Sequence, residues 1–110
     1  MVNAEVTDRG LKVVLTGMDA WLYALRPRWE VVVPLDHVRQ AEVGRPVGRA
    51  VKRHRGGRGG HGGNMMAARP TGPTAVIDLD GDPWLRMTLS VPDPEETVAA
   101  INGALRLRRQ

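Results

Sequence analysis

Several residue types that build crosslinks and active sites are missing or scarce in this sequence. Cysteine is absent from all 110 residues, which excludes disulfide bonds, thiol nucleophiles and metal sites with cysteine ligands. Phenylalanine is absent too, so the bulky part of the core is expected to come from Trp21, Tyr23, Trp29 and Trp84. A chain of this length is expected to fold as one domain over residues 1–110.

Long apolar runs are also missing. No stretch approaches the roughly 18 apolar residues of a membrane-spanning helix. The first ten residues include Asn3, Glu5, Asp8 and Arg9, and they lack the basic start and apolar stretch of a signal peptide. We therefore expect a cytoplasmic protein without a transmembrane segment.

Acidic residues are absent from one segment, at about residues 44–64. This segment contains eight glycines and no hydrophobic periodicity, which predicts a long loop. The whole chain has a net charge of +4, but outside the loop 10 Lys and Arg face 12 Asp and Glu, a net charge of −2. The positive charge therefore belongs to six loop residues: Arg45, Arg49, Lys52, Arg53, Arg55 and Arg58.

Apolar residues that alternate with polar ones predict most of the strands. In the first of them, Leu11, Val13 and Leu15 are expected to face the core. An Asp-Gly turn predicts that the last two strands form a hairpin. The register of residues 38–43 stays open, because Val38, Gln40, Ala41 and Val43 compete for the inner face. The predicted strands are residues 11–15, 29–33, 38–43, 65–69, 74–79 and 84–91.

Helical signals occur twice. Residues 18–25 predict a short helix or an irregular connector that ends before Pro27. Asp93 and Pro94 predict the start of a longer C-terminal helix, with Asp93 as its cap and two glutamates in its first turn. The apolar stripe of that helix is Val98, Ile101, Ala104 and Leu105. The fold class is thus α+β, mainly β, with six or seven antiparallel strands in a barrel capped by one amphipathic helix.

Three stretches carry a resemblance to a known family: residues 29–43 (especially 33–43), 73–79 and 86–95. Here the chain resembles a family of small uncharacterised actinobacterial proteins with a bacterial pleckstrin-homology-like (PH-like) domain. The resemblance implies a seven-stranded PH-like barrel with the C-terminal helix at one opening. It implies no established activity and no catalytic residues. The basic glycine run at residues 45–64 departs from the usual family pattern.

The basic loop has three interpretations. The plainest is a solvated loop without a ligand. The second is an anionic ligand, either nucleic acid or a phospholipid headgroup, held by the six basic residues, because interleaved arginine and glycine suit sequence-tolerant contact with phosphates. The third is a protein partner. No aromatic residue between Val43 and Arg69 is available to stack on a base, which weakens the nucleic-acid interpretation.

No pattern in the sequence indicates catalysis or a cofactor. His54 and His61 lie in a glycine-rich tract that offers too few ligands for a metal site. Asp78, Asp80 and Asp82 resemble a calcium loop only in part, because Leu89 occupies the position of its required glutamate. We therefore predict a protein that is not an enzyme and that binds no metal or cofactor.

The first functional hypothesis is an interaction module that binds a protein partner or itself. Residues 18–25 and Trp84 are expected to fill the core, and the alternative is that they form a self-association surface. An open strand edge in such a domain can also pair with an added strand.

Overall fold

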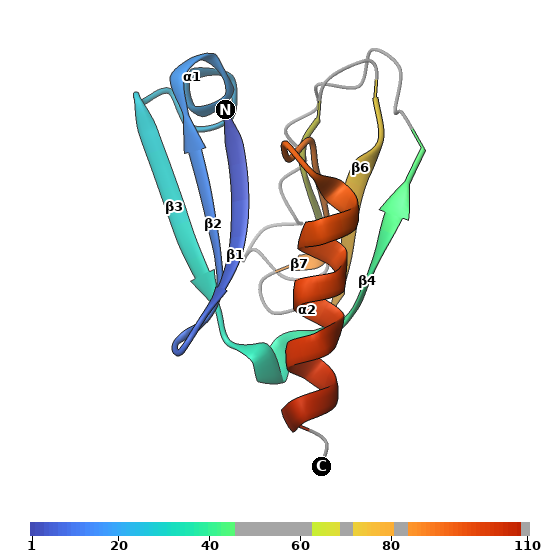
Figure 1. Cartoon of the computed structure of the whole chain (residues 1–110). Coiled ribbons are helices and arrows are strands. Elements are labelled where there is room, and N and C mark those ends of the chain that lie inside the picture. The colour runs from blue at the N-terminus through green and yellow to red at the C-terminus, as the bar shows by residue number, and fades with distance from the viewer. Residues whose placement is uncertain (46–62, 69–71, 81–83, 109–110) are drawn as a thin grey trace.

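The first β-sheet is an antiparallel meander formed by the N-terminal third of the chain (Figure 1). Its strands are β1 (Val2–Thr7), β2 (Gly10–Thr16) and β3 (Arg28–Val33), in that order. Helix α1 (Gly17–Ala24) joins β2 to β3 and was left open in the sequence as a helix or a connector. The computed structural model describes residues 1–45, 63–68, 72–80 and 84–108.

The second sheet has four strands in the order β4-β6-β7-β5. A short 3-10 helix at Leu35–His37 leads into it. The hairpin of β6 and β7 is antiparallel, as its Asp-Gly turn predicted, whereas β5 runs parallel to β7. The expectation that all strands are antiparallel is therefore wrong at β5. The strands are β4 (Val38–Gly44), β5 (Gly63–Ala67), β6 (Thr74–Leu79) and β7 (Trp84–Leu89).

Helix α2 (Pro94–Arg108) covers one side of the molecule, where it contacts β4, β1 and β6 (Figure 1). Its predicted cap is confirmed: Oδ1 of Asp93 accepts a hydrogen bond from the N–H of Glu96 at 3.1 Å. The backbone carbonyl of Asp93 accepts a second bond from the N–H of Thr97 at 3.0 Å. These two bonds satisfy donors that the first turn of a helix cannot pair internally.

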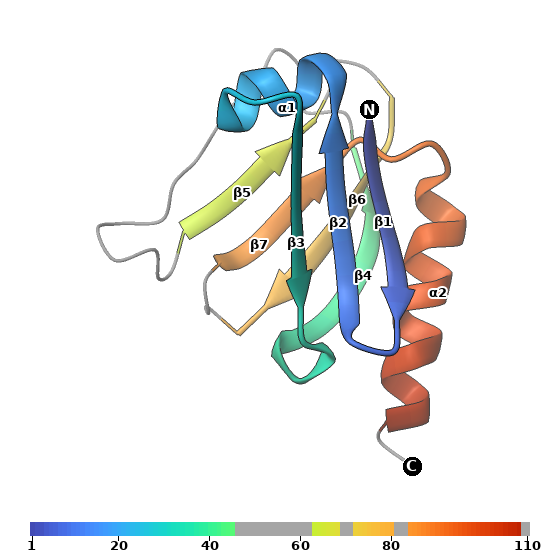
Figure 2. The same ribbon diagram turned by 90° about the vertical axis from the view of Figure 1, so that its left-hand side faces the viewer.

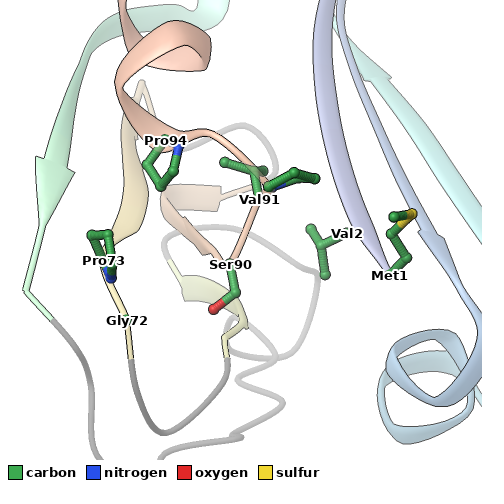
Figure 3. A pocket seen from close by; sticks show the side chains of 8 residues that line it. Met1, Val2, Gly72, Pro73, Ser90, Val91 and Pro94 are labelled. Carbon is green, nitrogen blue, oxygen red and sulfur yellow. The ribbon is translucent and has the colours of Figure 1, made fainter.

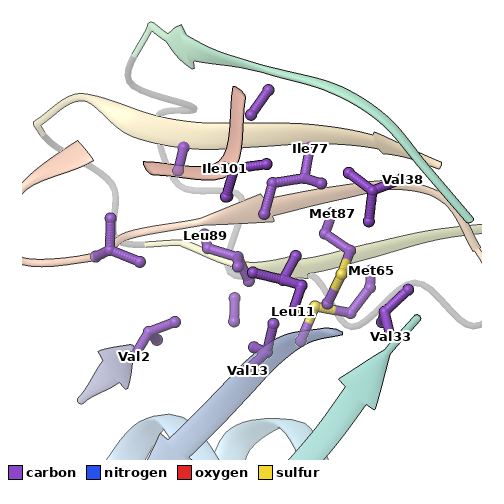
Figure 4. Close-up of a cluster of buried hydrophobic side chains, with 14 of the residues drawn as sticks. Val2, Leu11, Val13, Val33, Val38, Met65, Ile77, Met87, Leu89 and Ile101 are labelled. Atoms are coloured by element: carbon purple, nitrogen blue, oxygen red, sulfur yellow. The ribbon is translucent and has the colours of Figure 1, made fainter. Parts of the chain in front are cut away.

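The hydrophobic core lies between the two sheets and extends under α2 (Figure 4). Leu11, Val13 and Leu15 point into it, as predicted, and each is fully buried. Burying such side chains away from water is the main force that holds the two sheets together. The other sheet contributes Met65, Ile77, Met87 and Leu89, and α2 contributes Ile101 and Leu105.

The predicted barrel is not closed. Within the described residues the strands form two separate sheets, and no strand pairing joins them. The chain leaves the first sheet at Pro34, which has no N–H for a further ladder bond, and β4 then pairs with β6 and not with β3. The mainly β composition and the C-terminal helix are confirmed.

Two local expectations change as well. Strand β1 was not predicted from the sequence, although Val2, Ala4 and Val6 alternate with polar residues along it. Asn3, Glu5 and the nearby turn made the segment resemble a polar terminus. In β4 a register shift falls between Val38 and Gln40. This bulge turns Val38 and Ala41 inward and leaves Val43 exposed.

Candidate interaction surface

Only one of the six basic residues predicted as an anion site falls among the described residues. Arg45 follows β4 directly and is exposed. The other five, Arg49, Lys52, Arg53, Arg55 and Arg58, lie outside the described residues. The site that the structure itself presents is elsewhere, at helix α1 and strand β3.

An apolar ridge runs along the exposed side of α1. Met18 and Trp21 are three residues apart on α1, so their side chains share one face, and Leu25 follows as the residue that caps the helix C-terminus. Their exposed fractions are 71%, 50% and 71%. The prediction that this segment fills the core is therefore wrong for these three residues. We call them the α1 ridge.

The opposite face of α1 holds the helix against the rest of the molecule. Ala20 is fully buried there, and Tyr23 packs against the core. Figure 2 shows α1 at the end of the first sheet, where β2 ends and β3 begins. A helix placed across the end of a sheet buries one face only, which leaves the α1 ridge to solvent.

Three aromatic rings connect α1 with both sheets. Tyr23 of α1 meets Trp29 of β3 at 4.8 Å between ring centroids, with the planes inclined by 63°. Trp29 in turn meets Trp84 of β7 at 6.1 Å and 67°. Such edge-to-face contacts favour the attraction between ring edge and ring face. Trp29 and Trp84 are half-buried, so the expectation of core filling holds for Trp84.

Leu25 ends α1 in an unusual conformation. Its backbone φ is +57°, in the left-handed region, and its N–H donates to the carbonyl of Trp21 at 3.1 Å. Glycine or asparagine is the usual residue at this position, because a leucine there costs about 1 kcal/mol. Neither the backbone nor burial accounts for a leucine here. Non-glycine residues in this conformation cluster at functional sites, so Leu25 is a candidate contact residue.

Strand β3 forms one edge of the first sheet. It pairs with β2 on one side, and no described strand pairs with its other side. Arg28 and Glu30 point to the solvent face, where Nη2 of Arg28 donates to Oε2 of Glu30 at 3.1 Å. Val32 lies on the same face and is 41% exposed.

A row of polar residues crosses the outer face of the second sheet. Gln40 donates to Oδ2 of Asp78, and Nε of Arg86 donates to Oδ1, both at 2.9 Å. The hydrogen bond from Gln40, aided by the bond and charge of Arg86, lowers the pKa of Asp78 against the opposing effect of burial. Because this carboxylate is ionised and already paired, it is a poor proton donor at neutral pH. We assign the row a structural role, although it borders an open hollow of about 630 Å³.

A smaller cavity of about 370 Å³ lies between the start of β1 and the connection from β7 to α2 (Figure 3). Its walls are mainly aliphatic and proline side chains, with the hydroxyl of Ser90 among them. Its lining comprises Met1, Val2, Gly72, Pro73, Ser90, Val91, Pro92 and Pro94. None of the described residues that line it has a charged side chain.

Of the residues weighed as metal ligands, His54, His61 and Asp82 lie outside the described residues, so the structure does not test them. In the described part of the chain, no group of three or more His, Asp or Glu residues gathers in a way that could hold an ion. Nδ1 of His37 lies 2.7 Å from Oδ2 of Asp80, and the N–H of Asp80 donates to the carbonyl of His37 at 2.9 Å. This pair ties the start of β4 to the end of β6.

Comparisons with known proteins add no identity. Neither protein-family models, nor curated proteins, nor solved structures give a match to this chain. Among the described helices, none combines the length and the apolar character needed to cross a membrane. The described features that bear on function are the α1 ridge and the β3 edge.

Proposed function

We propose that this protein is a non-enzymatic, PH-like module that acts by binding another protein molecule, either a partner or a copy of itself. The observation that carries the proposal is the α1 ridge. Two large apolar side chains on one face of α1 and a third at its C-terminal cap form a patch, whereas apolar residues scattered singly over a surface need no explanation.

The conformation of Leu25 supports the same proposal. A glycine at this position would relieve the backbone and remove an exposed apolar group at once. The chain instead keeps a leucine that favours neither folding nor solubility. Contact with a binding partner gives this residue a use that the isolated domain does not.

Sedimentation velocity over a hundredfold range of concentration tests the proposal. We expect the wild-type protein to associate as concentration rises, and we expect Trp21→Asp to remain monomeric because it places a charge at the centre of the ridge. Leu107→Asp is the matched control, since Leu107 is 72% exposed on α2 and away from α1. It should associate like the wild type.

Leu25→Gly separates binding from folding. It should weaken association while the free energy of unfolding stays the same or rises by up to about 1 kcal/mol. If the wild type stays monomeric at every concentration and no partner protein binds through the ridge, the proposal is wrong.

An alternative function is the binding of an anionic ligand, nucleic acid or a phospholipid headgroup, through the basic loop. The observation in its favour is the charge distribution, because Arg45 and five further loop residues carry the whole positive excess of the chain. Replacing residues 45–62 by a neutral Gly/Ser linker should then abolish salt-dependent binding to heparin, RNA and acidic vesicles. Unchanged binding would remove this alternative.

A further inference from the structure

We propose that the partner is a second copy of this chain, bound by antiparallel pairing of the two β3 edges about a two-fold axis at Trp29. This inference rests on the proposed function and specifies its partner and its geometry. The two copies would join their three-stranded sheets into one sheet of six strands.

The β3 edge offers the backbone groups that such pairing needs. In an antiparallel sheet every second residue of an edge strand directs its N–H and C=O outward, away from its only neighbour. Residues 28–33 pair with β2 in continuous register, so the edge is extended along its whole length. Pro27 and Pro34 flank the strand. With the axis at Trp29, residues 28–30 of the two strands pair directly, whereas residues 31–33 of each copy lie opposite residues 25–27 of the other.

The opposite charges of Arg28 and Glu30 on β3 favour a second copy as the partner, and they favour one register of pairing. Edge strands commonly carry charges that prevent pairing, but those on β3 have opposite signs and stand two residues apart on one face. With the axis at Trp29, Arg28 of each copy lies directly opposite Glu30 of the other. Both side chains are at least half exposed and can reach across, so the edge is complementary to itself.

Other two-fold registers do not give this match. An axis at Glu30 places the two Glu30 carboxylates opposite each other, and an axis at Arg28 does the same for the two guanidinium groups. An axis at Val31 places Glu30 opposite Val32 and Arg28 opposite Pro34, so neither charge on β3 meets an opposite charge. Because like charges directly opposite destabilise a sheet, the Trp29 register is the one that the sequence of β3 favours.

The same register brings the α1 ridge into the contact. Beyond Glu30, the second copy's strand continues past Pro27 toward Leu25, the C-terminal end of α1. Val32 of the second copy, exposed in a single chain, then lies opposite Arg26, the residue that follows exposed Leu25. Three directly paired residues in each strand bury less than the roughly 1,200 Å² typical of stable interfaces, so we expect a weak dimer that depends on the ridge as well.

Charge reversal tests the register. Arg28→Glu puts four carboxylates in the contact, and Glu30→Arg puts four guanidinium groups there. Each single variant should raise the dimer dissociation constant at least about fivefold, because two symmetric pairs become repulsive. The double variant R28E/E30R restores opposite charges across the axis and should recover most of the wild-type affinity. Both substituted positions are on the solvent face. Circular dichroism checks that all three variants fold.

Cysteine crosslinking tests the contact directly, since the chain has no cysteine of its own. Chains carrying Arg28→Cys should form disulfide-linked dimers when mixed with chains carrying Glu30→Cys. Either variant alone should crosslink poorly, because identical positions are offset diagonally by about 7–8 Å, outside disulfide reach. Leu107→Cys serves as the control for random collisions.

The outcomes separate this inference from the function on which it rests. If Trp21→Asp abolishes association while the charge reversals leave it unchanged, the interaction module stands and the β3 pairing is wrong. Failure of R28E/E30R to recover affinity, or crosslinking of Glu30→Cys alone as efficient as in the mixture, would also overturn the pairing. A wild-type chain that never self-associates overturns it outright.

Discussion

The side-chain amide of Asn102 pairs with both backbone polar groups of Ala41. Oδ1 of Asn102 accepts the N–H of Ala41 at 3.0 Å, and Nδ2 donates to the carbonyl of Ala41 at 2.8 Å. An asparagine on α2 thereby makes the two bonds that a neighbouring strand would make. Helix α2 thus occupies the outer edge of β4. The other edge strands of the described sheets are β1, β3 and β5, and β3 is the one that carries the Arg28–Glu30 pair.

Asn102→Ala should destabilise the fold by about 1–3 kcal/mol, because it leaves the N–H and C=O of Ala41 without partners beneath a packed helix. Chemical denaturation gives the free energy of unfolding. Arg106→Ala, an exposed substitution on the same helix, should change it by no more than about 0.5 kcal/mol. Equal effects of the two substitutions would mean that Asn102 does not hold the β4 edge.

Gly10→Ala and Gly17→Ala form a matched pair of substitutions in the first sheet region. Gly10 has φ +135°, and a Cβ there would lie 2.3 Å from the carbonyl oxygen of Val33. Gly17 has φ +63° and open space around it. Both alanines are strained, but Gly10→Ala must also displace β3.

We therefore expect Gly17→Ala to cost about 1 kcal/mol and Gly10→Ala clearly more, about 3 kcal/mol or above. Thermal unfolding of the two variants side by side measures the difference. If Gly10→Ala is no less stable than Gly17→Ala, the close approach of Gly10 to Val33 is wrong.

Asp78 predicts a pH dependence of stability. Its folded-state pKa lies below the ordinary value of 3.8, chiefly because of the hydrogen bond from Gln40. The stability that it contributes is therefore fully present above pH 3.8 and is lost as the pH falls through the folded-state pKa. Asp78→Asn should be less stable than the wild type at pH 7, and the difference should shrink on acidification below pH 3.8.

Urea denaturation from pH 7 down to pH 2.5 measures this difference. In Gln40→Leu the pKa of Asp78, followed by NMR, should move back up toward 3.8. A difference between Asp78→Asn and the wild type that is independent of pH would contradict the assigned role of the carboxylate.

Sequence patterns predicted the parts of the fold in which one face is buried throughout. Leu11, Val13 and Leu15 alternate without interruption, because β2 is the central strand of its sheet and its inner face meets only the core. The cap at Asp93 was equally readable, since capping depends on a few neighbouring residues. In β4 the bulge after Val38 interrupts the alternation of inward and outward side chains. No local sequence pattern predicted this bulge.

The candidate site was harder to predict, because it depends on how far a neighbour covers an apolar side chain. Met18, Trp21 and Leu25 are visible in the sequence, but residues 18–25 were predicted only as a short helix or a connector. Which face of α1 turns to solvent depends on the sheet end beneath Ala20 and on the ring of Trp29. Those contacts come from strands elsewhere in the chain, so composition alone favoured burial. The alternation of Arg28 and Glu30 was equally visible, but it gains meaning only once β3 is known to be an edge.

The ring contacts between Tyr23, Trp29 and Trp84 predict that Trp84 contributes to the free energy of unfolding by linking the two sheets. Trp84→Leu removes the ring that meets Trp29 across the sheets, so it should cost about 1–3 kcal/mol for a half-buried aromatic residue. Trp21→Leu keeps an apolar group on the exposed ridge and should cost no more than about 0.5 kcal/mol. Tryptophan fluorescence during urea unfolding measures both variants. If Trp84→Leu unfolds at the same urea concentration as Trp21→Leu, the contact between Trp29 and Trp84 does not help to join the two sheets.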